Sequence, residues 1–334
     1  MLSVIFSRLK KKTLSLTLMI CPEELAINLN NVRFKKLFEC ILNEDKKKVI
    51  YEEKTLLGHD YIVSFIMLLN KTQLVSGGID ETIKLWDLKN GKCITDIDDK
   101  TNQIKCLAKL NKTQLASGNF SNSIKIWDIK TNVCLKTLIG HTRVILSLVK
   151  MNKDVLVSGS WDETIKIWDL PTGTCLKTLI GHTGNIFIIA KLNQSQIASG
   201  SKDNTIKIWD LPTGNCLQTL KGNTVTGIPS IIIYNLSQII SGGYDSSVKI
   251  WDLITGDCLK TISTDTDGVE KLEKLTRTQL LVVGCNAIKI YDLLNGSCLK
   301  TLNLGGLNPH KAVVLSKFQI VIGYKNFMQI IDLD

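Results

Sequence analysis

A Trp-Asp pair that recurs at almost constant spacing is the feature that most restricts how this chain of 334 residues can fold. Five intact pairs and two weakened ones follow one another every 40 to 42 residues, at Trp86-Asp87, Trp127-Asp128, Trp168-Asp169, Trp209-Asp210, Trp251-Asp252, Tyr291-Asp292 and Ile331-Asp332. A fixed repeat of this length is typical of solenoids and propellers. Each unit contains short apolar runs separated by Ser-Gly, Asp and Thr-Gly turns, and no unit has room for a long helix. We therefore expect seven units built from strands.

The third and fourth units carry the fullest set of repeated residues. Residues 140–169 and 181–210 each contain Gly-His, Ser-Gly, Asp and Trp-Asp in the same register. These segments resemble the WD-repeat family, and the resemblance extends over about residues 58–334. It implies an all-β fold, a seven-bladed β-propeller in which each unit forms one four-stranded blade around a central channel.

The two ends of the repeat region predict how such a ring closes. The seventh unit stops at Asp334 without the strand that reads Cys134-Leu135-Lys136-Thr137-Leu138 in the second unit. Residues 54–59 match residues 136–141, so we expect a strand within residues 49–57 to complete the last blade and to remove its open edge. The predicted regions are a helical segment at residues 1–44 and a propeller at residues 45–334.

Three units share a set of four residues that includes the members of a catalytic triad. A His precedes a Ser by 17 residues, an Asp by 21 and a Trp by 27 in His59/Ser76/Asp80/Trp86, His141/Ser158/Asp162/Trp168 and His182/Ser199/Asp203/Trp209. One active site needs one constellation, whereas this set occurs three times without a nucleophile turn or an oxyanion loop. The family resemblance implies instead a buried hydrogen-bond chain that ties a turn to a strand.

Other signatures of catalysis are missing from the sequence. It contains no P-loop, no G-x-G-x-x-G after a strand, no H-E-x-x-H, no G-x-S-x-G and no His/Cys cluster with metal-ligand spacing. We expect no enzymatic activity, no cofactor and no metal.

The second unit lacks the His and has Ser121 in place of Asp, and the fifth has Asn223 in place of His. We predict that the second, sixth and seventh blades open most easily.

Lysines account for most of the formal charge of +10 and occupy repeat-equivalent positions. One set precedes the Trp and the other lies in the following strand: Lys84, Lys125, Lys166, Lys207, Lys249 and Lys289, then Lys136, Lys177, Lys260 and Lys300. Nucleic-acid binding favours a stripe with Arg and interleaved aromatic residues on one face. We therefore expect a solvated rim and no membrane as partner, with weak, salt-sensitive nucleic-acid binding as a distant third function.

Six cysteines recur about every 41 residues, at Cys93, Cys134, Cys175, Cys216, Cys258 and Cys298. Equivalent residues of neighbouring blades lie beyond the reach of a disulfide. We expect small buried hydrophobes of a reducing compartment, and hence a protein of the cytoplasm or nucleus.

The family resemblance also implies a partner site on one face of the disc. Its positions are the residue before the tetrad Asp, which gives Ile79, Phe120, Trp161, Lys202 and Tyr244, and the first strand of each blade, which gives Ser64, Leu146 and Phe187. Apart from Ser64 and Lys202 these are apolar or aromatic, so we predict an anchor surface for a polypeptide. The alternative is that the rings pack between blades. No Arg occurs among them, which disfavours a phosphorylated peptide.

Residues 2–42 lie outside the repeats and show helical spacing at Phe34, Leu37, Phe38, Ile41 and Leu42. Residues 5–9, 14–21 and 30–38 resemble the later two-thirds of an F-box, with Phe34 at the position of the usual Trp. This resemblance implies docking onto a Skp1-type adaptor of a cullin ubiquitin ligase, with the propeller selecting substrates. Two functions remain open, a ubiquitin-ligase substrate receptor and a general scaffold of another intracellular complex.

Overall fold

A computed structural model describes residues 54–100, 103–222, 227–302, 304, 307 and 309–333. The chain divides into two units, Met1–Ile50 and Tyr51–Asp334, and all described residues belong to the second. The predicted helical segment at residues 1–44 and the F-box resemblance within residues 2–42 lie outside the described residues.

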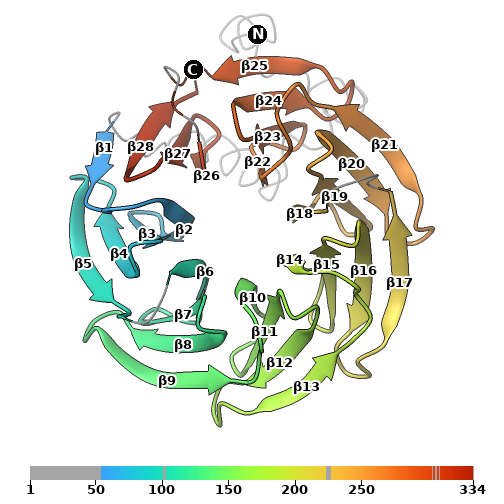
Figure 1. Cartoon of the computed structure of the whole chain (residues 1–334). Helices are drawn as coiled ribbons and strands as arrows, with labels where there is room; N and C mark the ends of the chain where they lie inside the picture. The colour runs from blue at the N-terminus through green and yellow to red at the C-terminus, as the bar shows by residue number, and fades with distance from the viewer. Residues whose placement is uncertain are drawn as a thin grey trace, which may run out of the picture. The chain divides into compact units, whose positions relative to one another are not determined.

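Seven four-stranded antiparallel sheets form a ring, which confirms the predicted seven-bladed β-propeller (Figure 1). The first blade contains β2 (Val63–Asn70), β3 (Gln73–Gly78), β4 (Thr82–Asp87) and β5 (Lys92–Asp98), and the second contains β6 (Ile104–Lys109), β7 (Gln114–Asn119), β8 (Ser123–Asp128) and β9 (Val133–Ile139). The third contains β10 (Ile145–Lys150), β11 (Val155–Ser160), β12 (Ile165–Asp169) and β13 (Cys175–Leu179), and the fourth contains β14 (Ile186–Lys191), β15 (Gln196–Ser201), β16 (Thr205–Asp210) and β17 (Cys216–Lys221). The fifth contains β18 (Ser230–Ile233), β19 (Gln238–Gly242), β20 (Ser247–Asp252) and β21 (Cys258–Ser263), and the sixth contains β22 (Lys271–Lys274), β23 (Gln279–Val283), β24 (Ile288–Asp292) and β25 (Cys298–Leu302). The seventh contains β26 (Lys311–Ser316), β27 (Gln319–Gly323), β28 (Phe327–Asp332) and β1 (Lys54–Leu57).

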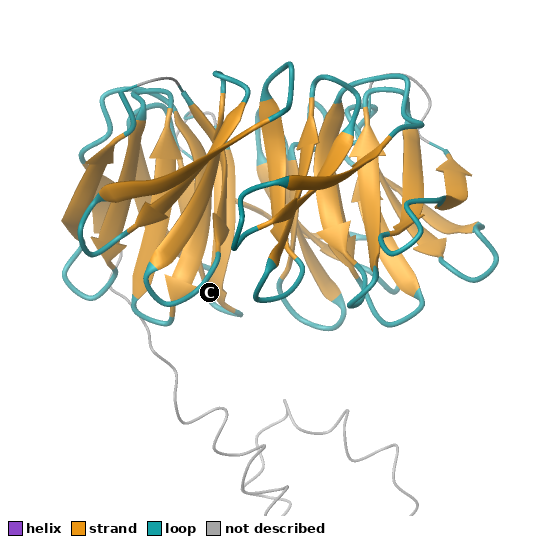
Figure 2. Ribbon diagram, turned by 90° about the horizontal axis from the view of Figure 1, so that it is seen from below, coloured by secondary structure: helices purple, strands orange, loops and turns teal. Residues whose placement is uncertain are grey.

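Each blade runs from an inner strand near the axis of the ring to an outer strand at its rim. The inner strands are β2, β6, β10, β14, β18, β22 and β26 (Figure 1). Because the strands are antiparallel, successive turns alternate between the two faces of the ring (Figure 2). None of the described residues forms a helix that is long and apolar enough to cross a membrane.

The ring closes through the strand that the sequence comparison predicts. Strand β1 pairs with β28 from Lys54 opposite Ile330 to Leu57 opposite Phe327, so the N-terminal strand completes the seventh blade. Leu56 of β1 is fully buried in a cluster that includes Trp86 of the first blade and Met328 of the seventh. The prediction of closure by residues 49–57 is confirmed for the part of that range that the structure describes.

Neighbouring blades pack face to face through apolar residues of their middle and inner strands. Between the third and fourth blades, Ile165 and Ile167 share one cluster with Ile186 and Trp209. The glycine of the Ser-Gly pair permits this approach, since a Cβ at Gly159 would lie 2.6 Å from Cγ2 of Ile186. The recurring Ser-Gly pair is therefore a packing requirement as well as a strand end.

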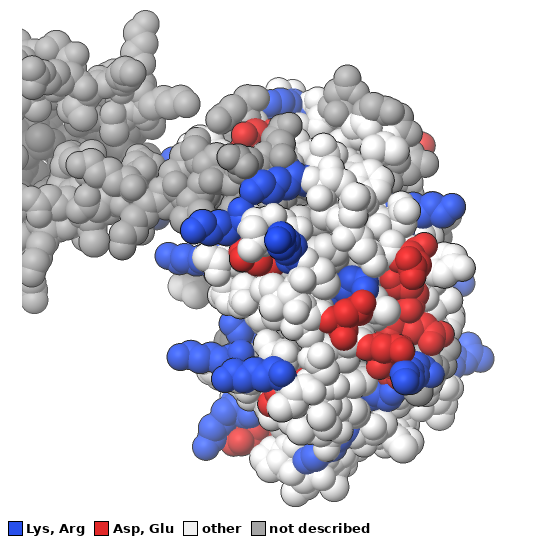
Figure 3. All heavy atoms as spheres, turned by 90° about the vertical axis from the view of Figure 1, so that its left-hand side faces the viewer, with Lys and Arg blue, Asp and Glu red and all other residues white. Residues whose placement is uncertain are grey.

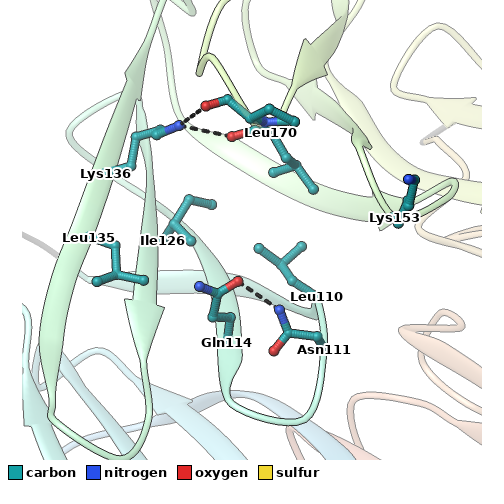
Figure 4. A pocket seen from close by; sticks show the side chains of 9 residues that line it. Leu110, Asn111, Gln114, Ile126, Leu135, Lys136, Lys153 and Leu170 are labelled. Atoms are coloured by element: carbon teal, nitrogen blue, oxygen red, sulfur yellow. Dashed lines mark hydrogen bonds between the residues drawn. The ribbon is translucent and has the colours of Figure 1, made fainter.

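The predicted solvated lysine rim is wrong, because none of these lysines is largely exposed and each reaches an acceptor. Most lysines of the Trp-preceding set bond to the adjacent outer strand, as Lys166 Nζ donates to Thr178 Oγ1 at 2.8 Å. Lys125 and Lys289 bond instead to Asp99 and Asp265, in the segments that enter their own blades. The second set reaches the next blade, and Lys136 Nζ donates to the carbonyls of Leu170 and Pro171 at 2.9 and 2.6 Å beside a cavity of about 290 Å³ (Figure 4). The same ties link Lys177 to Leu211 and Pro212, Lys260 to Leu293 and Leu294, and Lys300 to Leu333.

One side of the ring carries charges of both signs. In Figure 3, many lysines and arginines lie toward one edge of this side and a group of acidic residues lies toward the other. Nucleic acid favours a continuous basic stripe with interleaved aromatic residues, and this side carries acidic residues as well.

The prediction that the six recurring cysteines are buried is also wrong. Cys93, Cys175, Cys216, Cys258 and Cys298 are exposed, and Cys134 is half-buried. All six lie on outer strands, whose far side has no neighbouring strand. Among the described residues every cysteine is a free thiol, as the spacing predicts.

Candidate functional site

The structure brings each of the three predicted sets of four residues together. In the third blade, Trp168 Nε1 donates to Ser158 Oγ at 2.8 Å, and Ser158 Oγ lies 2.6 Å from His141 Nε2. His141 Nδ1 lies 2.7 Å from Asp162 Oδ2. The set of His59, Ser76, Asp80 and Trp86 and the set of His182, Ser199, Asp203 and Trp209 have the same contacts at 2.6 to 2.8 Å.

The direction of these hydrogen bonds follows from the Trp. Its indole N–H donates only, so the Ser hydroxyl accepts from Trp and donates its own proton to His Nε2. The other imidazole nitrogen then carries the proton and donates to the Asp carboxylate. The serine hydroxyls are fully buried and engaged at both ends, so they are held as structural relays and not as nucleophiles.

The tetrad aspartates are held in their ionised form. Burial alone would raise the pKa of Asp80, but hydrogen bonds from His59, Thr82 and the Asp60 backbone outweigh burial and lower this pKa to about 2. The pKa values of Asp162 and Asp203 are lowered in the same way. Each carboxylate therefore fixes the turn between the second and third strands of its blade to the turn that enters the blade.

The second blade lacks a tetrad and has a different buried network in its place. Asp99, which occupies the position of the Gly in Gly-His, is buried and pairs with Lys125. Asn119 Nδ2 also donates to Asp99 at 3.3 Å, and Ser117 Oγ still accepts from Trp127 Nε1 at 2.8 Å. The ion pair ties the turn that enters the blade to β8, and the Asn119 bond ties it to the end of β7, so the second blade is better held than the missing His suggests.

The residues predicted to bind a partner lie around the axis on the face that carries the tetrad turns. Ser64, Leu146 and Phe187 are the bulge residues at the start of their inner strands, where the register shifts by one residue. Ile79, Phe120, Trp161, Lys202 and Tyr244 each occupy the turn after the second strand and donate a backbone hydrogen bond to the segment that enters the same blade. We call these eight residues the hub surface. It also includes Lys105, Glu270, His310 and Lys311, which lie at or next to the equivalent positions of the other blades.

Two aromatic pairs of the hub surface bridge neighbouring blades. Phe120 of the second blade meets Trp161 of the third edge to face at 5.7 Å, and Phe187 of the fourth meets Tyr244 of the fifth at 5.9 Å. All four rings remain partly exposed, while Lys202 between the pairs is exposed. The alternative of packing between blades therefore holds for one side of each ring, and the other side is available for contact.

A lysine that the sequence analysis missed belongs to the same ring of positions. Lys105 is the bulge residue of β6, and its Nζ lies 4.9 Å from the centre of the Phe120 ring. Its position is not found by counting from the His of Gly-His, which the second unit lacks. Counting back from the Trp would have found it, because Lys105 precedes Trp127 by 22 residues, as Leu146 precedes Trp168.

The sixth and seventh blades contribute charged groups to the hub surface. Glu270 and His310 hold the bulge-equivalent positions by register, since the residues after them pair with Val283 and Gly323. Lys311 Nζ lies 3.4 Å from Glu270 Oε2, and Cys285 Sγ lies 3.7 Å from Glu270 Oε1. Across the described residues, no group of three His, Cys, Asp or Glu side chains is arranged to hold a metal ion.

Comparison with known proteins agrees with this geometry. The family model described as "WD domain, G-beta repeat" matches residues 51–87, 132–169, 173–210 and 214–252. The chain is similar to the nuclear distribution protein nudF of Aspergillus niger, with 37% identity over 62 residues, which is 18% of this chain and 14% of that protein. It therefore spans only a small part of that relative's length.

Among solved structures, the chain is similar to the WD40 β-propeller domain of Doa1 at a TM-score of 0.75 and 23% identity. The alignment covers 84% of this chain and 96% of that one, and it supports the fold alone. Four repeats of the chain thus match this family model, and the structural similarity shows the β-propeller fold.

Proposed function

We propose that the chain is a non-enzymatic scaffold that binds another protein through the hub surface. The observation that carries this proposal is the pair of half-exposed aromatic contacts, Phe120 with Trp161 and Phe187 with Tyr244. Three large rings at turns and one at the start of an inner strand leave apolar area in water that the fold alone does not need to expose. Aromatic side chains of this kind supply much of the binding free energy in protein interfaces.

The tetrads support the same proposal by what they do to the turns. In three blades the turn that carries a hub residue is fixed by a carboxylate with a lowered pKa, as Asp162 is next to Trp161. Side chains on rigid turns lose little conformational entropy when a partner binds. The blades thus form a preorganised frame for the hub surface.

The proposal is tested by isolating the partners of the full-length protein from its own cells and comparing three forms of it. We expect Trp161→Ala to lose proteins that the unchanged chain retains. Leu236→Ala is the matched control, because Leu236 is exposed on a turn of the opposite face. Equal retention of every partner by all three forms would contradict binding at the hub surface.

We propose more narrowly that the protein is the substrate-recognition subunit of a Skp1-cullin-F-box ubiquitin ligase in the cytoplasm or nucleus. The support is the F-box resemblance within residues 2–42 together with a propeller that follows it in the same chain. Co-purification of a Skp1-type adaptor, lost on deletion of residues 2–42, is the expected result. An adaptor-free complex would favour a general scaffold of another assembly.

A further inference from the structure

Two cations of the hub surface have no carboxylate partner among the described residues, the exposed Lys202 and the half-buried Lys105. Lys311 pairs with Glu270, and Lys125 pairs with Asp99. Lys105 takes part in no ion pair or hydrogen bond of the described residues, and its only specific neighbour there is the Phe120 ring. Its ammonium therefore stacks on an aromatic face at the start of an inner strand, within reach of a bound molecule.

The surroundings of Lys105 make this charge more costly to leave unpaired. Burial lowers the pKa of Lys105, and the positive charge of Lys311 lowers it further. Lys105 and Lys311 belong to the second and seventh blades, which flank the first blade, so their mutual repulsion acts across the hub surface. An added anionic group near Lys105 would relieve both effects.

The apolar side of the site adjoins this cation directly. Phe120 contacts Lys105 with its face and forms a T-shaped pair with Trp161, and Leu146 occupies the neighbouring bulge position. Trp161 Nε1 is buried without a hydrogen-bond acceptor, the one such side-chain atom among the described residues. A buried donor without an acceptor destabilises the fold, and an indole turned toward a bound carboxylate recovers that loss.

We infer that the hub surface recognises a polypeptide segment in which an apolar residue stands next to an aspartate or glutamate. The apolar side chain packs on Phe120, Trp161 and Leu146, and the carboxylate becomes the counter-ion of Lys105. A carboxylate is favoured over a phosphate because one ammonium, without the planar fork of an Arg, offers a single charge. This inference rests on the proposed function and adds the chemistry of the partner.

The test uses the full chain and four pools of immobilised twelve-residue peptides. Each pool has randomised flanks and a fixed central pair, Leu-Glu, Leu-Gln, Leu-Lys or Leu-phosphoserine. The unchanged protein is compared with Lys105→Gln, with Lys105→Glu and with Trp161→Ala. Lys112→Glu is the matched control, since Lys112 is exposed on the opposite face of the same blade. Melting curves verify that every variant is folded.

We expect the unchanged protein to bind the Leu-Glu pool about tenfold more tightly than the Leu-Gln pool, as for a charged hydrogen bond in a half-buried site. Lys105→Gln should abolish this preference, Lys105→Glu should transfer it to the Leu-Lys pool, and Lys112→Glu should change neither. Equal binding of Leu-Glu and Leu-Gln that is still lost in Trp161→Ala would overturn the acidic preference and leave the proposed function intact. Preferential binding of the phosphoserine pool would also overturn it.

If Trp161→Ala bound every pool as the unchanged protein does, the hub surface itself would be the wrong site. If no pool bound the unchanged protein, the acidic-segment inference would be rejected, and the comparison of partners isolated from cells would decide the proposed function separately.

Discussion

Replacing Leu56 with Ala tests how much the closing strand contributes to the stability of the ring. Leu56 is fully buried, and it contacts both the first and the seventh blade. The substitution removes three carbon atoms, which at about 0.8 kcal/mol per buried methylene amounts to roughly 2.4 kcal/mol of transfer free energy. The cavity left between two rigid sheets adds to this, so we expect a loss of about 3–4 kcal/mol in the free energy of unfolding.

The neighbouring residue supplies the control for this experiment. Leu57 lies on the same strand but is 71% exposed, so Leu57→Ala should change the free energy of unfolding by less than about 0.5 kcal/mol. Urea titration of both full-length variants, followed by tryptophan fluorescence, measures the two values. Equal losses in the two variants, or a loss below about 1 kcal/mol for Leu56→Ala, would refute the reasoning that β1 is a structural part of the seventh blade.

Four further predictions follow from the same contacts. Because the pKa of Asp80 is about 2 in the fold against 3.8 for a free carboxyl, its ionised form stabilises the protein above that range, and this stability is lost as the pH falls. The free energy of unfolding of Asp80→Asn should therefore fall less at acidic pH than that of the unchanged protein. An equal fall in both proteins would count against the tetrad. Asp99→Ala removes the buried carboxylate that pairs with Lys125 and should cost about 3–5 kcal/mol in urea unfolding, with a loss below about 1 kcal/mol as the contrary result. Amide hydrogen exchange should be faster in the sixth and seventh blades than in the second, and uniform protection would argue against unequal blades. Deletion of residues 1–57 should unfold or aggregate the protein, and a deletion variant with the full melting temperature would show that the ring closes without β1.

The repeat register was enough to predict the blades, their number and the closing strand. These features depend on residues that recur at fixed spacing, such as the Trp that meets a buried Ser in five blades. What recurs is visible in one sequence, because each unit serves as a comparison for the others.

Features that belong to one blade could not be predicted in the same way. Asp99 replaces the Gly of the second unit, and only the structure shows that its carboxylate is buried against Lys125. Lys105 is not found from the Gly-His register because this unit lacks the His. The exposure of the recurring lysines and of the outer-strand cysteines could not be predicted for a different reason, since periodicity gives their position along the chain but not what lies beside them in the fold.

The most direct test of the account is a photo-crosslinking measurement on a partner isolated with the unchanged protein. A photoreactive phenylalanine analogue is placed at the exposed hub residue Lys202, and at Lys112 on the opposite face, in separate full-length chains. The account predicts a covalent product with the partner from position 202 and none from position 112. A product from position 112 alone would contradict binding at the hub surface.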